Sequence, residues 1–256
     1  MKFDKQSTLR GLALGVGLAC IGLAAQADML TDVQKARKVR VAIDLGSPPF
    51  GTTDGAMKPT GSDVDTAQLL ARDLGVELEI VQTTGANRIP FLQTQKADLV
   101  ISSLSVTPER ERVIDFSAPY ADIRSVVAAP KSFAIKGMAD LAGKRVAVAR
   151  GTTNDKLLTD AKSGAEVVRF DDDATQITAV TTGQVEIFVT SPAIVKTIVA
   201  KAPKLEVETK FVIKTFPLGI GIRKGEPKML AWVNEWITKN SQNGKLAEIY
   251  KKYHGG

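Results

Sequence analysis

Apolar positions along the chain follow two alternating periods from residue 38 onward. Residues 38–43 form a short apolar run that predicts a buried strand. Residues 63–74 carry apolar side chains at helical spacing, and Gly75 is placed to end that helix. The pattern then predicts a strand over 76–81, a helix over 89–95 and a strand over 98–102. This alternation is typical of a parallel sheet with helices on both faces.

The same pattern starts again near residue 145. It predicts strands over 145–149, 166–170 and 185–190. A strand-to-helix turn at Gly151 opens one helix between them, and a second helix begins at Asp172. An amphipathic helix closes the chain. The chain therefore contains a second α/β unit with the same order of elements as the first.

Two extended segments, over 125–129 and 211–222, connect the two units. We therefore expect an α/β fold of two parallel-sheet lobes joined by two crossing strands. Lobe 1 is expected to comprise 28–123 plus 215–256, and lobe 2 is expected to comprise 124–214. Ligands of such sheets bind beyond the carboxyl ends of the strands, so a cleft between the lobes is the expected site.

The first 27 residues have the features of a signal peptide. Three basic residues precede an apolar run over 11–23, and Ala25 and Ala27 form a small-x-small cleavage signature. The run is about 13 residues long, whereas a membrane-spanning helix needs roughly 20. We expect residues 1–27 to be cleaved during export to the periplasm. Lipidation of Cys20, the only cysteine, is an alternative.

Charge and composition exclude several functions. The formal net charge is +6 at pH 7, and its basic residues are scattered without interleaved aromatic residues, so nucleic acid is not expected as a partner. The single histidine, His254, lies in the tail, which excludes Ser-His-Asp catalysis and a histidine-based metal site. Asp171, Asp172 and Asp173 are interpreted as the acidic first turn of a helix rather than as metal ligands. We expect no cofactor, no metal and no enzymatic activity.

The strongest local signal for binding is a serine-rich segment that ends the strand at 98–102. Thr107 and Pro108 after it have the features of a helix start, which places Arg110 in the first helical turn. A guanidinium there can hold a carboxylate through two charge-assisted hydrogen bonds, and Ser103 and Ser105 can add donors. The alternative is an exposed arginine beside an ordinary turn.

A set of motifs spans nearly the whole chain after residue 27 in a familiar order. They are Pro48-Pro49-Phe50, Thr60-Gly61-Ser62-Asp63, Ala97-Asp98-Leu99-Val100-Ile101-Ser102, Thr107-Pro108-Glu109-Arg110, Asp115-Phe116-Ser117, Arg150-Gly151-Thr152-Thr153 and Gly244-Lys245-Leu246-Ala247. In these motifs the chain resembles the polar amino-acid family, family 3, of bacterial extracellular solute-binding proteins, which serve ATP-driven importers. Some features are similar to the glutamate/aspartate-binding branch.

The resemblance implies a two-lobed periplasmic binding protein fold of type II and a set of ligand contacts. It implies that Arg110 clamps the α-carboxylate of the ligand with help from Ser103 and Ser105. From lobe 2 it implies donors at the helix start that contains Thr152 and Thr153, a turn whose other interpretation is plain capping. Asp44 corresponds to a cleft position that meets a cationic group; its alternative role is to cap the turn before Pro48.

The chain departs from the family at several pocket positions. Ser47 and Gly85 stand where many members carry an aromatic ring. Arg88 corresponds to an arginine that holds a side-chain carboxylate in the glutamate/aspartate branch, so we expect a second anion clamp there, or else a solvated helix arginine. Thr190 and Ser191 stand where the family carries an aspartate for the ligand ammonium. The amino group would then bind weakly, use Asp44 or Asp172, or be absent.

These features predict a periplasmic substrate-binding component of an ABC transporter. The ligand is expected to be a small amino acid or related carboxylate, with an acidic amino acid ranked first, another polar amino acid second and an amine-free carboxylate third. The partner is expected to be an inner-membrane ABC permease, and the protein a monomer. One alternative is a lyase or dehydratase on the same scaffold, which needs a positioned general acid. Another is a sensor module.

Overall fold

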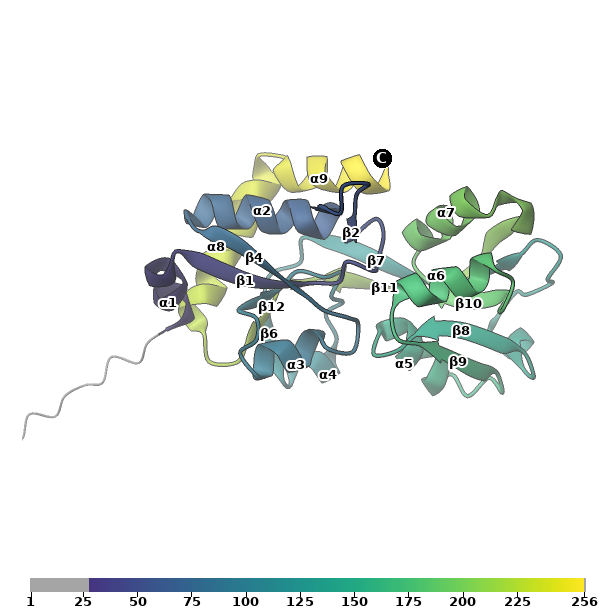
Figure 1. Ribbon diagram of the computed structural model, residues 1–256. Helices are drawn as coiled ribbons and strands as arrows, with labels where there is room; N and C mark the ends of the chain where they lie inside the picture. The colour runs from purple at the N-terminus through teal and green to yellow at the C-terminus, as the bar shows by residue number, and fades with distance from the viewer. Residues whose placement is uncertain (1–27, 256) are drawn as a thin grey trace, which may run out of the picture.

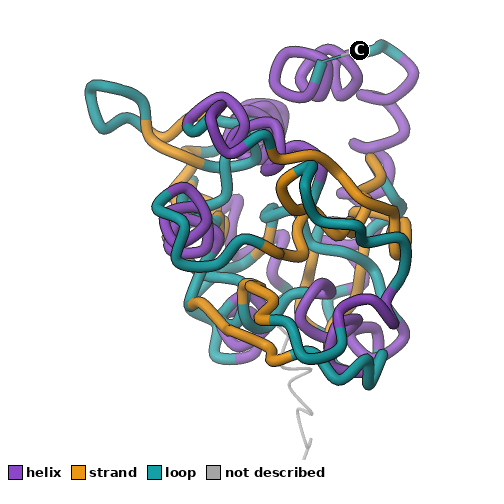
Figure 2. Tube along the Cα trace, turned by 90° about the vertical axis from the view of Figure 1, so that its right-hand side faces the viewer, coloured by secondary structure: helices purple, strands orange, loops and turns teal. Residues whose placement is uncertain are grey.

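Two α/β lobes lie side by side in the computed structural model, which describes residues 28–255 (Figure 1). In the view turned by 90° the lobes overlap, and the C-terminal helix ends at the edge of the molecule (Figure 2). The expected signal peptide and Cys20 lie outside the described residues. Within 28–255, no helix combines the length and the apolar character needed to cross a membrane.

The sheet of lobe 1 has five strands. Their spatial order is β4 (Glu77–Gln82), β1 (Lys38–Ile43), β5 (Leu99–Val100), β12 (Gly221–Arg223) and β6 (Ile114–Phe116). β4 and β5 run parallel to β1, whereas β12 runs antiparallel to both β5 and β6. The predicted parallel arrangement holds for β4, β1 and β5, and the returning chain adds β12 in the opposite direction.

Helices cover both faces of this sheet (Figure 1). One apolar cluster joins it to α1 (Met29–Ala36), α2 (Ser62–Leu74), α8 (Pro227–Gln242) and α9 (Lys245–His254), and it includes Val41, Leu70 and Met229. On the other face lie α3 (Arg88–Gln93) and α4 (Pro108–Glu111), and Leu92 of α3 packs into a second cluster. A short hairpin of β2 (Thr52–Thr53) and β3 (Pro59–Thr60) follows β1.

The C-terminal segment contains two helices where the pattern predicted one. Gly244 separates α8 from α9 and has φ of 79°, in the left-handed region that glycine enters without steric cost. Trp236 of α8 packs into the lobe 1 core and donates from Nε1 to Asp73 Oδ2 at 2.9 Å. The apolar spacing was therefore interpreted correctly as packing, but the helix break was missed.

The sheet of lobe 2 also has five strands. Their order is β11 (Val207–Leu218), β7 (Ala121–Pro130), β10 (Ile187–Thr190), β8 (Arg145–Ala149) and β9 (Glu166–Phe170). β8 is parallel to both β9 and β10, and β7 is antiparallel to β10 and β11. The predicted strands over 145–149 and 166–170 therefore match β8 and β9.

Helices also cover both faces of the second sheet. Helices α6 (Asp173–Thr181) and α7 (Pro192–Lys201) pack on one face around Phe188, and α5 (Thr153–Asp160) packs on the other through Leu158. Two 3-10 turns, Met138–Leu141 and Pro203–Leu205, complete the lobe. Helix α7 is an addition to the predicted elements.

The strands β7 and β11 run through both lobes and form the connection between them. They pair antiparallel from Val207 opposite Pro130 to Leu218 opposite Ala121, with two register shifts along the way. The predicted lobe boundaries, at 123/124 and 214/215, fall inside these two strands. The pair belongs to the sheet of lobe 2, and its far end reaches lobe 1, where Leu218 forms an isolated bridge with Ser105.

The core of lobe 2 provides a test of packing. Phe188 is fully buried between α6, α7 and the sheet. Phe188→Ala should therefore lower the free energy of unfolding by about 3–5 kcal/mol, because the truncated side chain leaves a cavity. Urea unfolding followed by circular dichroism measures the change. The matched control, Val199→Ala, removes a side chain from a residue that is 38% exposed, and should change stability by no more than about 0.5 kcal/mol. Equal midpoints for the two variants would contradict the packing argument.

Candidate functional site

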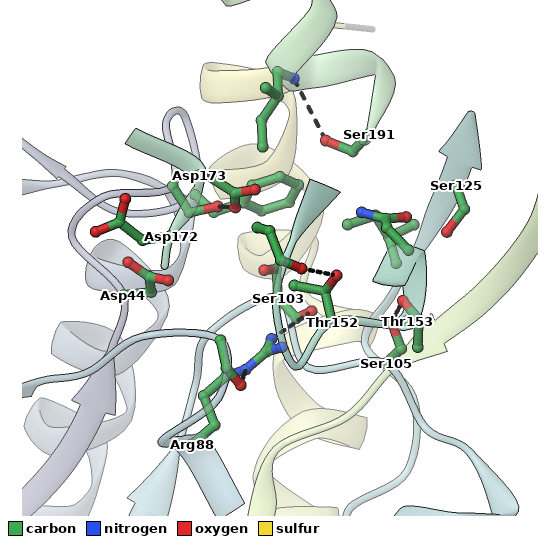
Figure 3. A pocket seen from close by; sticks show the side chains of 17 residues that line it. Asp44, Arg88, Ser103, Ser105, Ser125, Thr152, Thr153, Asp172, Asp173 and Ser191 are labelled. Carbon is green, nitrogen blue, oxygen red and sulfur yellow. Dashed lines mark hydrogen bonds between the residues drawn. The ribbon is translucent and has the colours of Figure 1, made fainter. Parts of the chain in front are cut away.

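A pocket between the lobes contains most of the predicted site residues (Figure 3). Seven of the nine line it: Asp44, Arg88, Ser103, Ser105, Thr152, Thr153 and Ser191. Arg110 and Thr190 do not. The cavity measures about 30 Å³, room for about two water molecules. The lobes are therefore closed upon each other, and a ligand can enter only after they separate.

Three polar contacts cross the cleft around this pocket. Ser47 Oγ donates to Asp173 Oδ2 at 2.6 Å, and the hydroxyls of Ser105 and Thr153 lie 3.3 Å apart. Arg110 Nη2 donates to the carbonyl oxygen of Gly151 at 3.2 Å. Each contact joins a residue of lobe 1 to a residue of lobe 2. The closed arrangement is therefore held by hydrogen bonds that vanish when the lobes part.

Hydroxyl groups and a helix start form one end of the pocket. Ser105 comes from the loop after β5, and Thr153 opens α5 directly after β8. Thr152 caps that helix: its hydroxyl accepts from Asp155 N at 3.2 Å and donates to Ala149 O at 2.7 Å. Backbone N–H groups in the first turn of a helix favour an anion. This end can accept a carboxylate between the two lobes.

Carboxylates form the opposite end of the pocket (Figure 3). Asp44 follows β1, and Asp172 caps α6 by accepting from Thr175 N at 2.8 Å. Both lie around Gly46: a methyl group there would be 3.3 Å from Asp44 Oδ1 and 3.8 Å from Asp172 Cγ. Burial raises the pKa of Asp44 above its ordinary value, and the nearby Asp172 raises it further. This end of the pocket favours a positively charged group.

A third carboxylate, that of Asp173, lies between these two ends in Figure 3. It belongs to the first residue of α6 and accepts the hydrogen bond from Ser47 of lobe 1. Burial raises its pKa to about 6, against the opposing effect of Ser47 and of the Arg88 guanidinium. Asp173 was not among the predicted site residues. The signal that identified Thr153, a helix start after a strand, also holds for it.

Arg88 lies in the pocket wall with its charge directed at carboxylates. Its Nε donates to Gly85 O at 3.1 Å and its Nη1 to Ser102 O at 2.8 Å, and the residue is only 5% exposed. The negative charges of Asp44, Asp63 and Asp173 oppose the effect of burial, which lowers the pKa of Arg88. The expectation that Arg88 holds a side-chain carboxylate stays a prediction: its Nε and Nη1 bond to backbone oxygens, whereas its Nη2 has no hydrogen bond to a residue in 28–255.

Arg110 lies at the rim rather than in the pocket lining. Its Nη1 donates to Ser105 O at 2.9 Å and its Nη2 to Gly151 O. Burial lowers the pKa of Arg110 to about 9. Its planar guanidinium therefore bonds to backbone oxygens of both lobes in the closed arrangement. It holds the wall beside Ser105 instead of pointing into the cavity.

Thr190 and Ser191 are placed differently from each other. Thr190 is fully buried and lies outside the pocket lining, and its Oγ1 has no hydrogen-bond partner among residues 28–255. Ser191 lines the pocket and caps α7, where Oγ accepts from Ile194 N at 3.4 Å. Neither side chain brings a charge to the cleft.

The part of the chain that the structure describes holds no group of three or more His, Cys, Asp or Glu residues arranged for a metal ion.

Two α/β lobes that present polar residues to a shared cleft define a class of ligand-binding protein, the two-lobed periplasmic binding fold of type II, and the prediction of this fold is confirmed. The chain belongs to the bacterial extracellular solute-binding proteins, family 3, whose model matches residues 39–256. The family resemblance seen in the sequence motifs is thereby confirmed.

Individual relatives differ in the ligands that they are named for. The L-cystine-binding protein TcyJ of Escherichia coli strain K12 is 28% identical over 246 residues, which is 95% of this chain and 92% of that protein. A mutant of ArgBP from T. maritima superposes with a TM-score of 0.82 at 32% identity, covering 89% of this chain and all of that one. An ancestral amino acid-binding protein, AncCDT-1, described as a precursor of cyclohexadienyl dehydratase, has a TM-score of 0.80 at 35% identity and covers 88% and 98%.

The buried carboxylates predict a pH dependence of stability. Burial raises the pKa of Asp63 to about 7, so the folded state holds a proton that the unfolded state releases between about pH 4 and pH 7. The unfolding free energy of the wild type should therefore fall relative to that of Asp63→Asn as the pH rises through this window. Urea unfolding of the ligand-free proteins at several pH values measures the difference.

The control for this prediction is Asp32→Asn, which alters an exposed carboxylate on α1. Its stability should follow that of the wild type across the whole window. The lowered pKa of His254, about 4 as a result of burial, makes stability rise with pH, but it does so equally in all three proteins. A constant difference between the wild type and Asp63→Asn from pH 4 to pH 7 would contradict the assignment of a buried, protonated Asp63.

Proposed function

We propose that this chain is the substrate-binding component of an ABC importer and captures an amino acid that carries a second positively charged group. The observation that carries the proposal is the distribution of charge along the pocket. Hydroxyls and a helix start form one end, while Asp44 and Asp172 form the other. An amino acid extended between them would have its carboxylate near Ser105 and Thr153 and its far end near the two aspartates.

The balance of charge supports a cationic ligand. Asp44, Asp172 and Asp173 line the pocket, and Arg88 is the one basic residue in that lining. Opposite charges within a few ångströms interact more strongly in a partly buried site than in water. A ligand with an extra positive charge would reduce the repulsion among the three carboxylates. A ligand with a second carboxylate would increase it, so we no longer rank an acidic amino acid first.

The relatives support the same chemical class. ArgBP of T. maritima has been described in an arginine-bound form, and TcyJ is named for L-cystine. Arginine carries a guanidinium at the end of its side chain, and cystine carries a second ammonium group. Both ligands combine an α-amino acid end with a distant positive group, although in cystine that group lies beside a second carboxylate, so arginine is the ligand that adds a net positive charge.

Closure of the lobes is the proposed mechanism of capture. Lobe 1 contributes Asp44 and Ser105, and lobe 2 contributes Asp172, Asp173 and Thr153, so only a closed state surrounds the ligand with all of them. A ligand that contacts both lobes favours that state by its differential affinity. We propose that the mature protein works in the periplasm after cleavage of residues 1–27, as a monomer that delivers its ligand to an inner-membrane permease.

Calorimetric titration tests this function. The chain without residues 1–27 is unfolded and refolded to remove bound solute, and then titrated with L-arginine, L-lysine, L-cystine, L-glutamine, L-glutamate and succinate. We expect at least one of the first three ligands to bind at least about 10-fold more tightly than glutamate, since one charge-assisted contact contributes about 1.5–3 kcal/mol. Asp44→Asn should reduce this preference. Tightest binding of glutamate or succinate would contradict the proposal.

Arg110→Ala tests the contribution of lobe closure to affinity. The substitution removes the bond to Gly151 O that crosses the cleft, so ligand affinity should fall by about 1.5–3 kcal/mol, the value of a hydrogen bond to a charged group. Calorimetry measures the affinity, and small-angle scattering measures the compaction on ligand addition. The matched control is Arg112→Ala, an exposed neighbour, which should bind as the wild type does. Unchanged affinity in Arg110→Ala would contradict the role in closure.

A further inference from the structure

The carboxyl end of β10 lacks the charge expected for recognition of a ligand amino group. The residue at that position is Thr190, which is fully buried, lies outside the pocket lining and carries no charge. Ser191 after it is occupied as the cap of α7. If the protein binds an α-amino acid, its ammonium must find a negative partner elsewhere, because an unpaired buried charge is strongly unfavourable.

Asp173 carries a negative charge between the two ends of the pocket. In Figure 3 its carboxylate lies between the Asp44–Asp172 pair and the hydroxyls of Thr152 and Thr153. Its Oδ2 accepts the hydrogen bond from Ser47, while its Oδ1 accepts none from any residue in 28–255. One oxygen is thus fixed by the protein, and the other is available to a ligand.

The other two carboxylates differ from Asp173 in position rather than in hydrogen bonding, since each of the three has donors among residues 28–255 on one oxygen only. Asp44 Oδ1 accepts from Gly46 N at 2.9 Å, and Asp172 Oδ1 accepts from both the amide and the hydroxyl of Thr175. Both lie around Gly46 at the far end of the pocket. They are therefore placed for the side chain of a ligand rather than for the amino group beside its carboxylate.

We infer that Asp173 is the residue that binds the α-ammonium group of the ligand, with Ser47 as the positioning residue that holds its carboxylate across the closed cleft. This inference rests on the proposed capture of an amino acid. It gives Asp173 a role in specificity: solutes that lack an α-amino group are rejected because they leave its carboxylate without a counter-charge. Of the surrounding charges, Asp44 and Asp172 add to its negative field and Arg88 reduces it.

The experiment combines one substitution in the protein with removal of the α-amino group from the ligand. Wild type and Asp173→Asn are titrated with L-arginine and with 5-guanidinopentanoate, which is arginine without its α-amino group, and also with L-lysine and 6-aminohexanoate. In the wild type, removal of the amino group should weaken binding by about 10-fold or more, since it removes a charge-assisted contact. In Asp173→Asn, the amino acid and its amine-free analogue should bind within about 3-fold of each other, because asparagine keeps the size of the side chain but not its charge.

Two further variants make the result specific. Asp172→Asn, the matched control on the neighbouring residue, should keep the full preference for the α-amino group. Ser47→Ala keeps the Asp173 charge but removes its hydrogen bond across the cleft, and should lower the preference for the α-amino group in addition to any loss of affinity that the amino acid and its amine-free analogue share. Urea unfolding midpoints establish that each variant is folded, and Ser47→Ala tests the inference even if Asp173→Asn does not fold.

The possible outcomes separate the inference from the function on which it rests. If the wild type binds none of L-arginine, L-lysine and L-cystine, the proposed ligand class is overturned, and the inference falls with it. If the wild type binds one of them and Asp173→Asn keeps the wild-type preference for the α-amino group, the inference alone is overturned. Loss of that preference in Asp173→Asn, together with its retention in Asp172→Asn, is the expected result.

Discussion

The buried guanidinium of Arg88 is the charge on which the geometry of the cleft depends. It faces carboxylates from both lobes, those of Asp44 and Asp63 in lobe 1 and that of Asp173 in lobe 2. It also fixes the backbone beside them, through bonds to the carbonyl oxygens of Gly85 and Ser102. The carboxylates that line the pocket, those of Asp44, Asp172 and Asp173, outnumber this one guanidinium, which is the basis of the proposal that the ligand carries an extra positive charge. The arginine that suggested an acidic ligand in the sequence therefore lies among carboxylates of the protein itself.

The pairing of β7 with β11 determines where this charge can act. Because the two strands pair along ten residues of β7 and pass through both lobes, the carboxyl ends of β1, β5 and β8 face a common cleft. Residues that end strands or begin helices then meet across it, as Ser105 and Thr153 do. The contacts across the cleft are few, among them three hydrogen bonds around the pocket and an ion pair of Lys156 with Glu109 at 3.9 Å. Closure is therefore sensitive to the one or two strong contacts that a ligand adds.

Much of this architecture could be predicted from hydrophobic periodicity. The pattern identified β1, β8 and β9 with their observed limits, because buried strands are short apolar runs between turns. The antiparallel direction of β12 could not be predicted, because periodicity carries no information on strand direction. For the site, seven of the nine residues expected from strand ends and from the family resemblance line the pocket. The hydrogen-bond partners of Arg88 and Arg110 could not be predicted, because long side chains can reach several partners. Their donors went to backbone oxygens that only the folded chain brings near.

The two departures from the family pattern, at Ser47 and at Thr190, have a common explanation in the position of Asp173. A small residue at 47 leaves space in which Asp173 of the opposite lobe approaches to 2.6 Å from the Ser47 hydroxyl. A ring at this position would fill that space and could not donate a hydrogen bond from a hydroxyl at Oγ. With a carboxylate held there, a second one at the end of β10 would add repulsion without adding a contact, and an uncharged Thr190 avoids that cost. On the inferred role of Asp173, this chain therefore carries the negative charge in the first turn of α6, beside Ser47, and none at the end of β10.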